Sequence, residues 1–203
     1  MKDIYFITGI GTGIGKTIVS AILTEKLKAD YWKPIQSGDL DISDSLHVRQ
    51  LISNEQTIIH PEKYRLSQPL SPHLSARIDG VEIKTAELEI PKTDNSLVIE
   101  GAGGLMVPLN NEELILDLIK KLDVAVIVVT QSYLGSINHT LLTLAVLKAH
   151  HIPIKGLIFN GKPNAETEAY ILNYSVLPLL GKIPYLSVIN KETIREAGIH
   201  LSL

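Results

Sequence analysis

The stretch Ile4-Tyr5-Phe6-Ile7-Thr8-Gly9-Ile10-Gly11-Thr12-Gly13-Ile14-Gly15-Lys16-Thr17 decides the fold. An apolar run leads into a glycine-rich turn, and an aliphatic helical pattern follows up to residue 27. This order predicts a strand, a phosphate-binding loop and a helix. A triphosphate needs backbone N–H groups at close range, which small residues permit, together with a flexible ammonium and a hydroxyl for Mg²⁺. The stretch therefore predicts a nucleoside triphosphate site.

The loop departs from the common phosphate-loop pattern, in which Gly and four residues precede Gly-Lys-Thr. That pattern requires a glycine at position 10, where the chain has Ile10, and Gly9 comes one residue too early. The dinucleotide pattern Gly-x-Gly-x-x-Gly fails as well, because Gly9 and Gly11 would need a third glycine at Ile14. The strict motifs alone therefore do not identify the site.

Gly15-Lys16-Thr17, at the start of a predicted helix, carries the interpretation instead. The alternative is a glycine-rich turn followed by an ordinary lysine. A lysine in the first helical turn opposes the helix dipole unless an anion is bound, which favours the nucleotide site. We expect Lys16 to bridge the β- and γ-phosphates and Thr17 to donate its hydroxyl oxygen to Mg²⁺.

Length and composition limit the function further. We expect one α/β domain over residues 1–203, since 203 residues are short for two independent cores. The net charge of -3, without a run of Lys or Arg, argues against nucleic acid or an anionic membrane as a partner. The chain has no cysteine, which excludes disulfides, iron–sulfur clusters and thiolate zinc sites. We find neither a signal-peptide pattern nor an apolar run of about 18 residues, so a cytoplasmic location is expected.

Apolar blocks of strand length alternate with helical patterns along the chain. We predict strands over 4–8, 31–35, 97–100, 124–130, 154–159 and 179–183, and helices over 17–27, 45–52, 113–122, 138–150, 166–174 and 191–197. The run over 124–130 is apolar on both faces, as in a parallel strand covered by helices on each side. The fold class is α/β: a nucleoside triphosphate hydrolase-like phosphate-loop fold with a mostly parallel sheet and helices on both faces.

Two further local predictions concern helix starts and a long connection. Ser43 and Asn164 are expected to cap the helices that follow them. Residues 58–92 show poor periodicity and are interrupted by prolines and a glycine, so we expect loops with short helical turns. In open α/β sheets, such excursions at the carboxyl ends of strands are where ligands bind.

Two carboxylates are candidates for metal ligation. Glu100 ends a buried strand predicted to lie in the same sheet as the phosphate-loop strand, where a Mg²⁺ ligand is wanted. The alternative is an ordinary carboxylate held by the N–H groups of the following Gly101-Ala102-Gly103-Gly104. Asp44 lies beside Ser43 and offers a third oxygen ligand, although the helix dipole explains a first-turn acid nearly as well.

Lys33 follows the second strand and precedes Pro34. At the mouth of the site it would place a second cation beside the γ-phosphate. Judged from the surrounding residues alone, a surface lysine at a strand end is the favoured interpretation. The seven histidines show no spacing typical of a metal site, and we interpret them as structural or solvated.

The order and spacing of seven motifs across nearly the whole chain resemble those of the dethiobiotin synthetase family. The motifs are Gly9-x-x-Thr12-x-x-Gly15-Lys16-Thr17, Trp32-Lys33-Pro34-x-x-Ser37-Gly38, Ser43-Asp44, Ser71-Pro72-His73, Glu100-Gly101-Ala102-Gly103-Gly104, Leu134-Gly135-Ser136-Ile137-Asn138-His139 and Leu180-Gly181-Lys182-Ile183-Pro184. The widened phosphate loop that fails the strict pattern is itself typical of this family.

The resemblance implies an ATP- and Mg²⁺-dependent cyclo-ligase of biotin synthesis. Such an enzyme closes the ureido ring of dethiobiotin from 7,8-diaminononanoate and CO₂ or bicarbonate, through a carbamate and a carbamic-phosphoric mixed anhydride. It implies a homodimer whose substrate site lies at the subunit interface. No protein nucleophile is needed, since cations that offset the repulsion between bound anions are the main catalytic device.

The resemblance also assigns residues to roles. As Mg²⁺ contacts it suggests Thr17, Asp44 and Glu100. As catalytic residues it suggests Lys33, Lys16, Thr12 and Ser37, and as further nucleotide contacts Gly13, Ile14, Gly15, Ile18, Gly101, Ala102, Gly103, Asn160, Gly161, Pro184, Tyr185 and Leu186. Asn160 and Pro184 to Leu186 would face the adenine. As substrate contacts it suggests Thr12 and Ser37, with Leu134, Gly135, Ser136, Ile137, Asn138 and Tyr170.

The chain departs from the family pattern at four places. Gly13 stands where many members carry an acidic residue. Gly161-Lys162 follows Asn160, and the sequence ends at Leu203, both of which differ from longer family members and leave base selectivity open. The stretch 85–95 is short and suggests a missing helix.

Three rival classes of protein would also contain a nucleotide site of this kind. A partitioning or positioning ATPase shares the architecture, but it usually has a second lysine in the loop, where this chain has Gly11. A related amidotransferase synthetase domain is the second class, and a nucleotide-binding module without turnover is the third.

Overall fold

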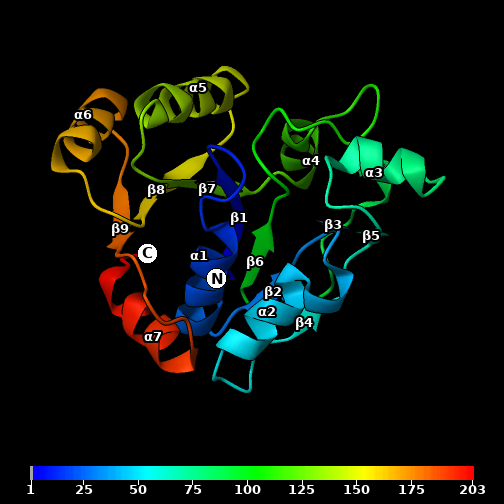
Figure 1. Cartoon of the computed structure of the whole chain (residues 1–203), viewed down its shortest axis with the longest axis horizontal. Helices are drawn as coiled ribbons and strands as arrows, with labels where there is room; N and C mark the ends of the chain where they lie inside the picture. Colours follow the sequence, from blue (N-terminus) through cyan, green and yellow to red (C-terminus); the bar gives the residue numbers. More distant parts are fainter. Residues whose placement is uncertain (1) are drawn as a thin grey trace.

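The computed structural model describes residues 2–203, and its centre is a seven-stranded sheet in the order β4-β2-β6-β1-β7-β8-β9 (Figure 1). All six strand pairs run parallel. The strands are β1 (Ile4–Gly9), β2 (Asp30–Trp32), β4 (Ile59–His60), β6 (Leu97–Glu100), β7 (Ala125–Thr130), β8 (Ile154–Asn160) and β9 (Leu179–Ile183). The predicted parallel α/β architecture is confirmed.

Seven α-helices occur in the described part of the chain; six of them connect strands, and α7 follows the last strand, β9. They are α1 (Lys16–Leu27), α2 (Asp44–Leu51), α3 (Pro72–Ile78), α4 (Ile115–Leu122), α5 (Ser136–Ala149), α6 (Ala165–Ser175) and α7 (Lys191–Ala197). Figure 1 shows α1, α2 and α7 on one face of the sheet and α5 and α6 on the other. α4 covers the same face as α5 and α6, since its apolar residues belong to the same cluster. Short 3₁₀ helices occur at η1 (Leu40–Ile42), η2 (Thr85–Glu87) and η3 (Gly198–His200). Over residues 2–203, none of these helices has the length and apolar character needed to cross a bilayer.

The five strands β1, β2, β6, β7 and β8 each supply both hydrophobic cores, because successive side chains point to opposite faces of the sheet. On β1, Phe6 packs into the cluster that includes α4, α5 and α6, whereas Tyr5 and Ile7 pack into the cluster with α1, α2 and α7. These five strands are therefore apolar on both faces, as the run over 124–130 indicated for β7.

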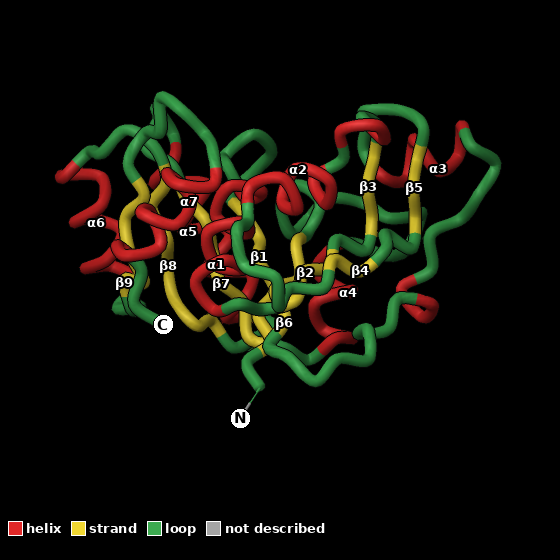
Figure 2. The backbone as a smooth tube through the Cα atoms, turned by 90° about the horizontal axis from the view of Figure 1, so that it is seen from below, coloured by secondary structure: helices red, strands yellow, loops and turns green. Residues whose placement is uncertain are grey.

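One predicted strand is wrong. The run over 31–35 forms not one strand but two, β2 and β3 (Ile35–Ser37), which belong to different sheets. Pro34 lies between them and lacks the N–H that a continuing ladder would need. β3 pairs with β5 (Tyr64–Leu66) in a separate two-stranded sheet, which stands beside the main sheet in Figure 2.

The connection 58–92 is more ordered than predicted. Besides helical turns it contains β4, β5 and α3, and strands of two or three residues are too short to show a period in the sequence. In the stretch 85–95 the only helix is the single 3₁₀ turn η2, and the loss of a helix relative to family members stays a prediction. The loop after β5 and the start of α3 lie against the site described below.

The two predicted helix caps have opposite outcomes. Asn164 caps α6, since its side chain accepts a hydrogen bond from the Thr167 N–H at 3.0 Å. The Ser43 cap is wrong, because its hydroxyl donates to Glu62 Oε1 at 2.8 Å instead of bonding the first turn of α2. A hydrogen bond from a hydroxyl to a charged carboxylate is stronger than one between neutral groups, so it orients the Ser43 side chain toward Glu62. Glu62 lies 19 residues later in the chain, so a local pattern does not reveal it.

Candidate functional site

The site lies where the carboxyl ends of β2, β6 and β1 meet, because these three strands are neighbours in the sheet. The loops that follow them enclose a cavity of ≈ 820 Å³. Twelve of the predicted site residues line it: Thr12, Gly13, Gly15, Lys16, Thr17, Ile18, Lys33, Ser37, Asp44, Glu100, Ala102 and Gly103. The fold thus brings together residues from separate segments of the chain.

The phosphate loop is held open by glycines with left-handed backbone angles. Gly15, the residue before α1, has φ 85°, and an added Cβ there would collide with the side-chain amide of Asn160. Gly13 has φ 74°. Both conformations strain any residue with a side chain, which explains why the loop is built from glycine. Residues 15–18 at the start of α1 line the cavity, and the first N–H groups of a helix, which have no intrahelical partner, form an anion site.

Lys16 is the first residue of α1 and is 8% exposed. Its Nζ donates to the Gly11 carbonyl oxygen at 2.9 Å, and the first turn of α1 contains no acidic residue. Burial lowers the pKa of Lys16, Glu100 partly offsets this effect and Lys33 adds to it, and the resulting pKa is about 8. The ammonium is poorly compensated by the protein, which is the environment expected of a group that binds an anionic ligand.

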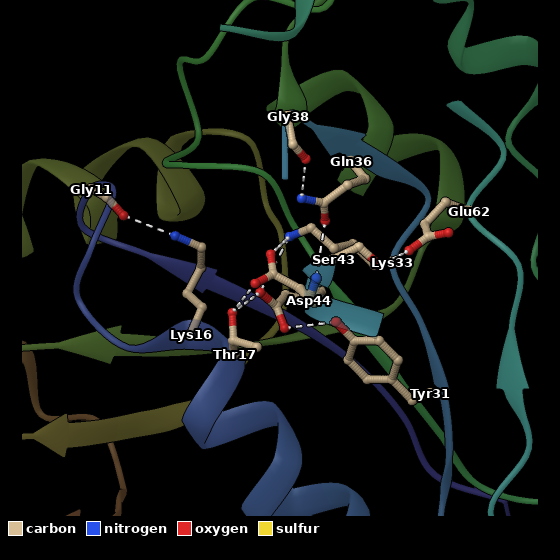
Figure 3. A network of polar contacts seen from close by, with 11 residues as sticks. Gly11, Lys16, Thr17, Tyr31, Lys33, Gln36, Gly38, Ser43, Asp44 and Glu62 are labelled. Carbon is tan, nitrogen blue, oxygen red and sulfur yellow. Dashed lines mark hydrogen bonds and ion pairs between the residues drawn. The ribbon is translucent and has the colours of Figure 1, made fainter. Parts of the chain in front are cut away.

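Thr17, Asp44 and Glu100 converge from α1, α2 and β6, and Figure 3 shows Thr17 and Asp44 next to each other. The Thr17 hydroxyl lies 2.9 Å from Asp44 Oδ1 and 2.9 Å from Glu100 Oε1, and it can donate its proton to one of them at a time. Within residues 2–203, no three His, Cys, Asp or Glu side chains gather to hold a metal. A cation at this point would therefore use two carboxylates and the hydroxyl.

Lys33 lies between these two carboxylates, 2.7 Å from Asp44 Oδ2 and 3.2 Å from Glu100 Oε1. Only 5% of the residue is exposed, so the surface-lysine interpretation is wrong. Burial alone would lower the pKa of Lys33, but Glu100 and Asp44 outweigh it and raise that pKa above its usual value. Burial would raise the pKa of Asp44, yet Lys33 outweighs that effect and lowers it. Lys33 and Asp44 are therefore charged at neutral pH.

The interpretation of Glu100 as a carboxylate held by the following glycines is also wrong. Its hydrogen-bond partners are side chains: Thr17 and Lys33 at Oε1, and the Tyr31 hydroxyl at Oε2, 2.9 Å away. The N–H of Gly101 donates instead to the Ile7 carbonyl oxygen on β1.

Two residues of this network were missed in the sequence. Tyr31 is fully buried, and burial together with Glu100 raises the pKa of its hydroxyl well above the usual value, so it remains a donor. Gln36 donates to the Gly38 carbonyl oxygen at 3.0 Å and accepts from the Asp44 N–H at 3.3 Å. The spacing of two between Tyr31 and Lys33 is the one sequence signal for the tyrosine, and we find none for Gln36.

The wall of the cavity opposite the phosphate loop is formed by β3 and the loop after β5. Ser37 lines the cavity, and the next residue, Gly38, has φ 70°. A Cβ on Gly38 would lie 2.5 Å from the Cα of Pro69, so only glycine permits this approach. Ser71 and Pro72 complete the wall, and the Ser71 hydroxyl lies 3.1 Å from Nδ1 of His73.

A second cavity of ≈ 300 Å³ lies at the ends of β8 and β9. Asn160, Gly161 and Pro184 line it, as do Glu168, Lys182 and His200. The Asn160 amide donates to the Ile14 carbonyl oxygen at 2.9 Å, which joins this cavity to the phosphate loop. Tyr185 is 78% exposed and lines neither cavity, and Leu186 is likewise outside both linings. Ile14 and Gly101 also line neither cavity.

The predicted substrate segment at the start of α5 is not brought to either cavity of this chain. Leu134, Gly135, Ile137 and Asn138 line neither of them, and Leu134 is completely exposed. Ser136 is buried, and its hydroxyl accepts a hydrogen bond from the Tyr133 N–H at 3.3 Å. Tyr170 is 51% exposed and stacks on Tyr174.

Solved structures share this fold. The septum site-determining protein MinD with Mg-ADP from Pyrococcus horikoshii matches with a TM-score of 0.61 at 19% identity, over 97% of this chain and 86% of that chain. A ParA family ATPase from Chlorobium tepidum matches with a TM-score of 0.55 at 14% identity, over 99% of this chain and all of that one. At such identities the likeness shows the fold alone and does not favour a positioning ATPase.

Sequence relatives are much more similar. A family model described as an AAA domain matches residues 3–193. Proteins named ATP-dependent dethiobiotin synthetase BioD from Christiangramia forsetii and Cytophaga hutchinsonii are each 49% identical to this chain. Both matches cover 97% of this chain, and they cover 94% and 96% of the two relatives, respectively. The one from Brucella ovis is 44% identical over 97% of the chain and 93% of its own length. The chain belongs to the ATP-dependent dethiobiotin synthetase family.

Proposed function

We propose that the protein is an ATP-dependent dethiobiotin synthetase, which closes the ureido ring of dethiobiotin from 7,8-diaminononanoate and CO₂ while ATP is converted to ADP and phosphate. The observation that carries the proposal is the convergence of Lys16, Lys33, Thr17, Asp44 and Glu100 at one cavity. Family membership supports the same conclusion.

The reaction has three chemical steps. A neutral amine of the substrate adds to the carbon of CO₂ and loses a proton, which gives a carbamate. A carbamate oxygen then attacks the γ-phosphorus of ATP, and the bond to the ADP oxygen breaks. The second amine attacks the carbonyl carbon of the mixed anhydride, the C–O bond to phosphate breaks, and a proton is lost as the ring closes.

The protein contributes positive charge and orientation to these steps. In our proposal the Lys16 ammonium holds the transferred phosphate, and the Lys33 ammonium offsets the charge that develops between carbamate and phosphate. Thr12 and Ser37, which line the same cavity, hydrogen-bond the substrate. Holding two mutually repelling anions in line is worth several orders of magnitude in rate, because solution would keep them apart.

The donor set fits Mg²⁺. Thr17, Asp44 and Glu100 offer only oxygen atoms, the hard ligands that this ion prefers, and the Thr17 hydroxyl already lies within hydrogen-bond distance of both carboxylates. Mg²⁺ bound there would offset the negative charge of the β- and γ-phosphates. Gln36 orients the backbone of Asp44 for this purpose.

We assign the second cavity to the nucleobase. Asn160, Gly161 and Pro184 line this cavity, and Tyr185 and Leu186 follow Pro184 in the chain. The hydrogen bond from Asn160 to Ile14 keeps the cavity next to the phosphate loop. Adenine is the expected base. In our proposal the backbone of Gly13, Gly15, Ile18, Ala102 and Gly103, which line the first cavity, surrounds the phosphates, and Ile14 and Gly101 are their neighbours in the chain.

We further propose a homodimer in which residues 134–138 of one subunit and Tyr170 contribute to the substrate site. Residues 134, 135, 137 and 138 line neither cavity of the single chain, and the exposed Leu134 and Tyr170 are available to a second copy. A single domain over residues 1–203 and a cytoplasmic location stay predictions.

One assay tests the function. Purified protein with Mg²⁺ and ATP is expected to release ADP much faster when both the diamine and bicarbonate are present. Omission of either should return release to the basal rate. Release that ignores the diamine but rises with a partner protein or lipid would contradict the synthetase proposal and favour a positioning ATPase.

The interface proposal has a separate test. Asn138→Ala should raise the KM for the diamine and leave the KM for ATP unchanged, because Asn138 lies outside both cavities of its own chain. The exposed His139→Ala, one residue along α5, is the matched control. An unchanged diamine KM in Asn138→Ala would exclude the contact.

A further inference from the structure

Glu100 divides its two carboxylate oxygens between two environments. Oε1 faces the cavity, where Thr17 and Lys33 lie within 3.2 Å, whereas Oε2 faces the core. The residue is 1% exposed. A carboxylate this deeply buried needs a partner at each oxygen, since an unsatisfied one costs free energy and invites rotation of the side chain.

The sheet register explains which residue supplies that partner. Tyr31 on β2 pairs with Val98 on β6, and Glu100 lies two residues further along β6, so all three side chains project from the same face. On the other side of β6, the residue that pairs with Glu100 is Ile7, whose side chain has no polar group. The Tyr31 hydroxyl donates a hydrogen bond to Glu100 Oε2 at 2.9 Å across this face.

We propose that Tyr31 is a positioning residue that fixes the orientation of the Glu100 carboxylate, so that Oε1 is held toward the cavity for the metal and for Lys33. The proposal rests on the proposed function, in which Glu100 is a Mg²⁺ ligand. Partners behind metal ligands commonly determine metal affinity, because they set the orientation of the ligating atom. Without the hydroxyl, Oε2 would lose its partner, and the carboxylate would turn to recover one from the Lys33 side.

The chain contains a matched control for this contact. Tyr5 on β1 also pairs with Val98, from the opposite side of β6, and belongs to the same buried cluster as Tyr31. It is 5% exposed, and the tyrosine hydroxyl bonded to Glu100 is that of Tyr31. Tyr31→Phe and Tyr5→Phe therefore remove the same atom from the same core, and only the first removes a partner of Glu100.

The experiment measures metal binding directly. Mn²⁺ affinity of the ADP-bound protein, followed by electron paramagnetic resonance, should fall about tenfold in Tyr31→Phe and stay at the wild-type value in Tyr5→Phe. The Mg²⁺ concentration for half-maximal turnover should rise by a similar factor in Tyr31→Phe, and high Mg²⁺ should restore its kcat. ADP affinity in EDTA should be unchanged. Phe keeps the ring that fills the core, and unfolding midpoints identify a temperature at which all three proteins are folded.

Two results would overturn the inference. One is wild-type Mn²⁺ affinity in Tyr31→Phe with a lowered unfolding midpoint, which would make the hydroxyl purely structural. The other is an equal loss of Mn²⁺ affinity in both variants. Failure of the wild-type protein to bind Mn²⁺ with ADP would contradict the metal site itself, so the two proposals fail in different ways.

Discussion

The phosphate loop and the end of β2 each hold one buried lysine at the same cavity, yet the two ammonium groups are stabilised in different ways. Lys16 has a backbone carbonyl as its partner, and burial lowers its pKa to about 8. Lys33 is more deeply buried, but two carboxylates raise its pKa. Burial alone therefore does not decide the state of a buried charge. Across residues 2–203, the charge of Lys16 in the phosphate loop has no carboxylate partner and is left for the ligand to neutralise. The charge of Lys33 at the end of β2 is already neutralised by Asp44 and Glu100.

The largest expected effect is on turnover in Lys33→Met. We expect kcat to fall about 10³-fold, because a cation aimed at developing charge is lost. The dissociation constant for ATP with Mg²⁺ should change by less than about threefold, as for an interaction made mainly in the transition state. Single-turnover kinetics and nucleotide titration separate the two quantities. Equal losses of both would mean that Lys33 binds ground-state nucleotide just as Lys16 is expected to.

The next effect is on stability and concerns the partners of Lys33. Glu100→Gln should lower the free energy of unfolding by about 3 kcal/mol, since it removes one side of a buried ion pair. Asp44→Asn should cost about 1 kcal/mol, because the Asp44 side chain is 33% exposed and water can replace the lost charge. Urea denaturation measures both. A larger loss of unfolding free energy in Asp44→Asn than in Glu100→Gln would show that burial does not determine the cost of removing a partner of Lys33.

Lys16→Met should mainly weaken ATP binding, whereas Lys33→Met should mainly lower kcat. ATP affinity should fall about 30-fold, because a charged hydrogen bond to phosphate is lost. The ligand-free protein should gain about 1 kcal/mol in stability, since a poorly compensated buried ammonium is replaced by an apolar side chain of similar size. Nucleotide titration and urea denaturation are the measurements. A clear loss of stability would contradict the view that Lys16 is paired mainly by its ligand.

The smallest effect is on pH dependence. Lys16 must be protonated to bind phosphate, and its pKa in the free protein is about 8. ATP affinity should therefore be full below that pH and fall by up to about tenfold per pH unit above it. Lys33, whose pKa is raised, does not titrate in this range. Isothermal titration from about pH 7 to about pH 9.5, which brackets a lysine with a lowered pKa, should show the decline in the wild-type protein and none in Lys16→Met. A decline in both would assign it to another group.

Local features of the sequence predicted much of the site. The phosphate loop, the helix after it and Glu100 at the end of a buried strand are all contiguous patterns, and α7 matched its predicted range of 191–197. Asn164 caps α6 through the Thr167 N–H, three residues away. Such features depend on neighbours within a few residues, so the physical cause and the sequence signal coincide.

Features that depend on distant partners were not predictable in the same way. Lys33 looks like a surface lysine until Glu100, 67 residues later, lies beside it. Ser43 turns away from its helix because Glu62 accepts its hydroxyl, and Tyr31 reaches Glu100 only because β2 and β6 are neighbours. By itself the sequence determined an α/β chain with a phosphate loop. The charge state and orientation of the groups around that loop were decided by the tertiary structure, because the Coulomb energy and desolvation of a side chain depend on spatial neighbours that the chain order does not reveal.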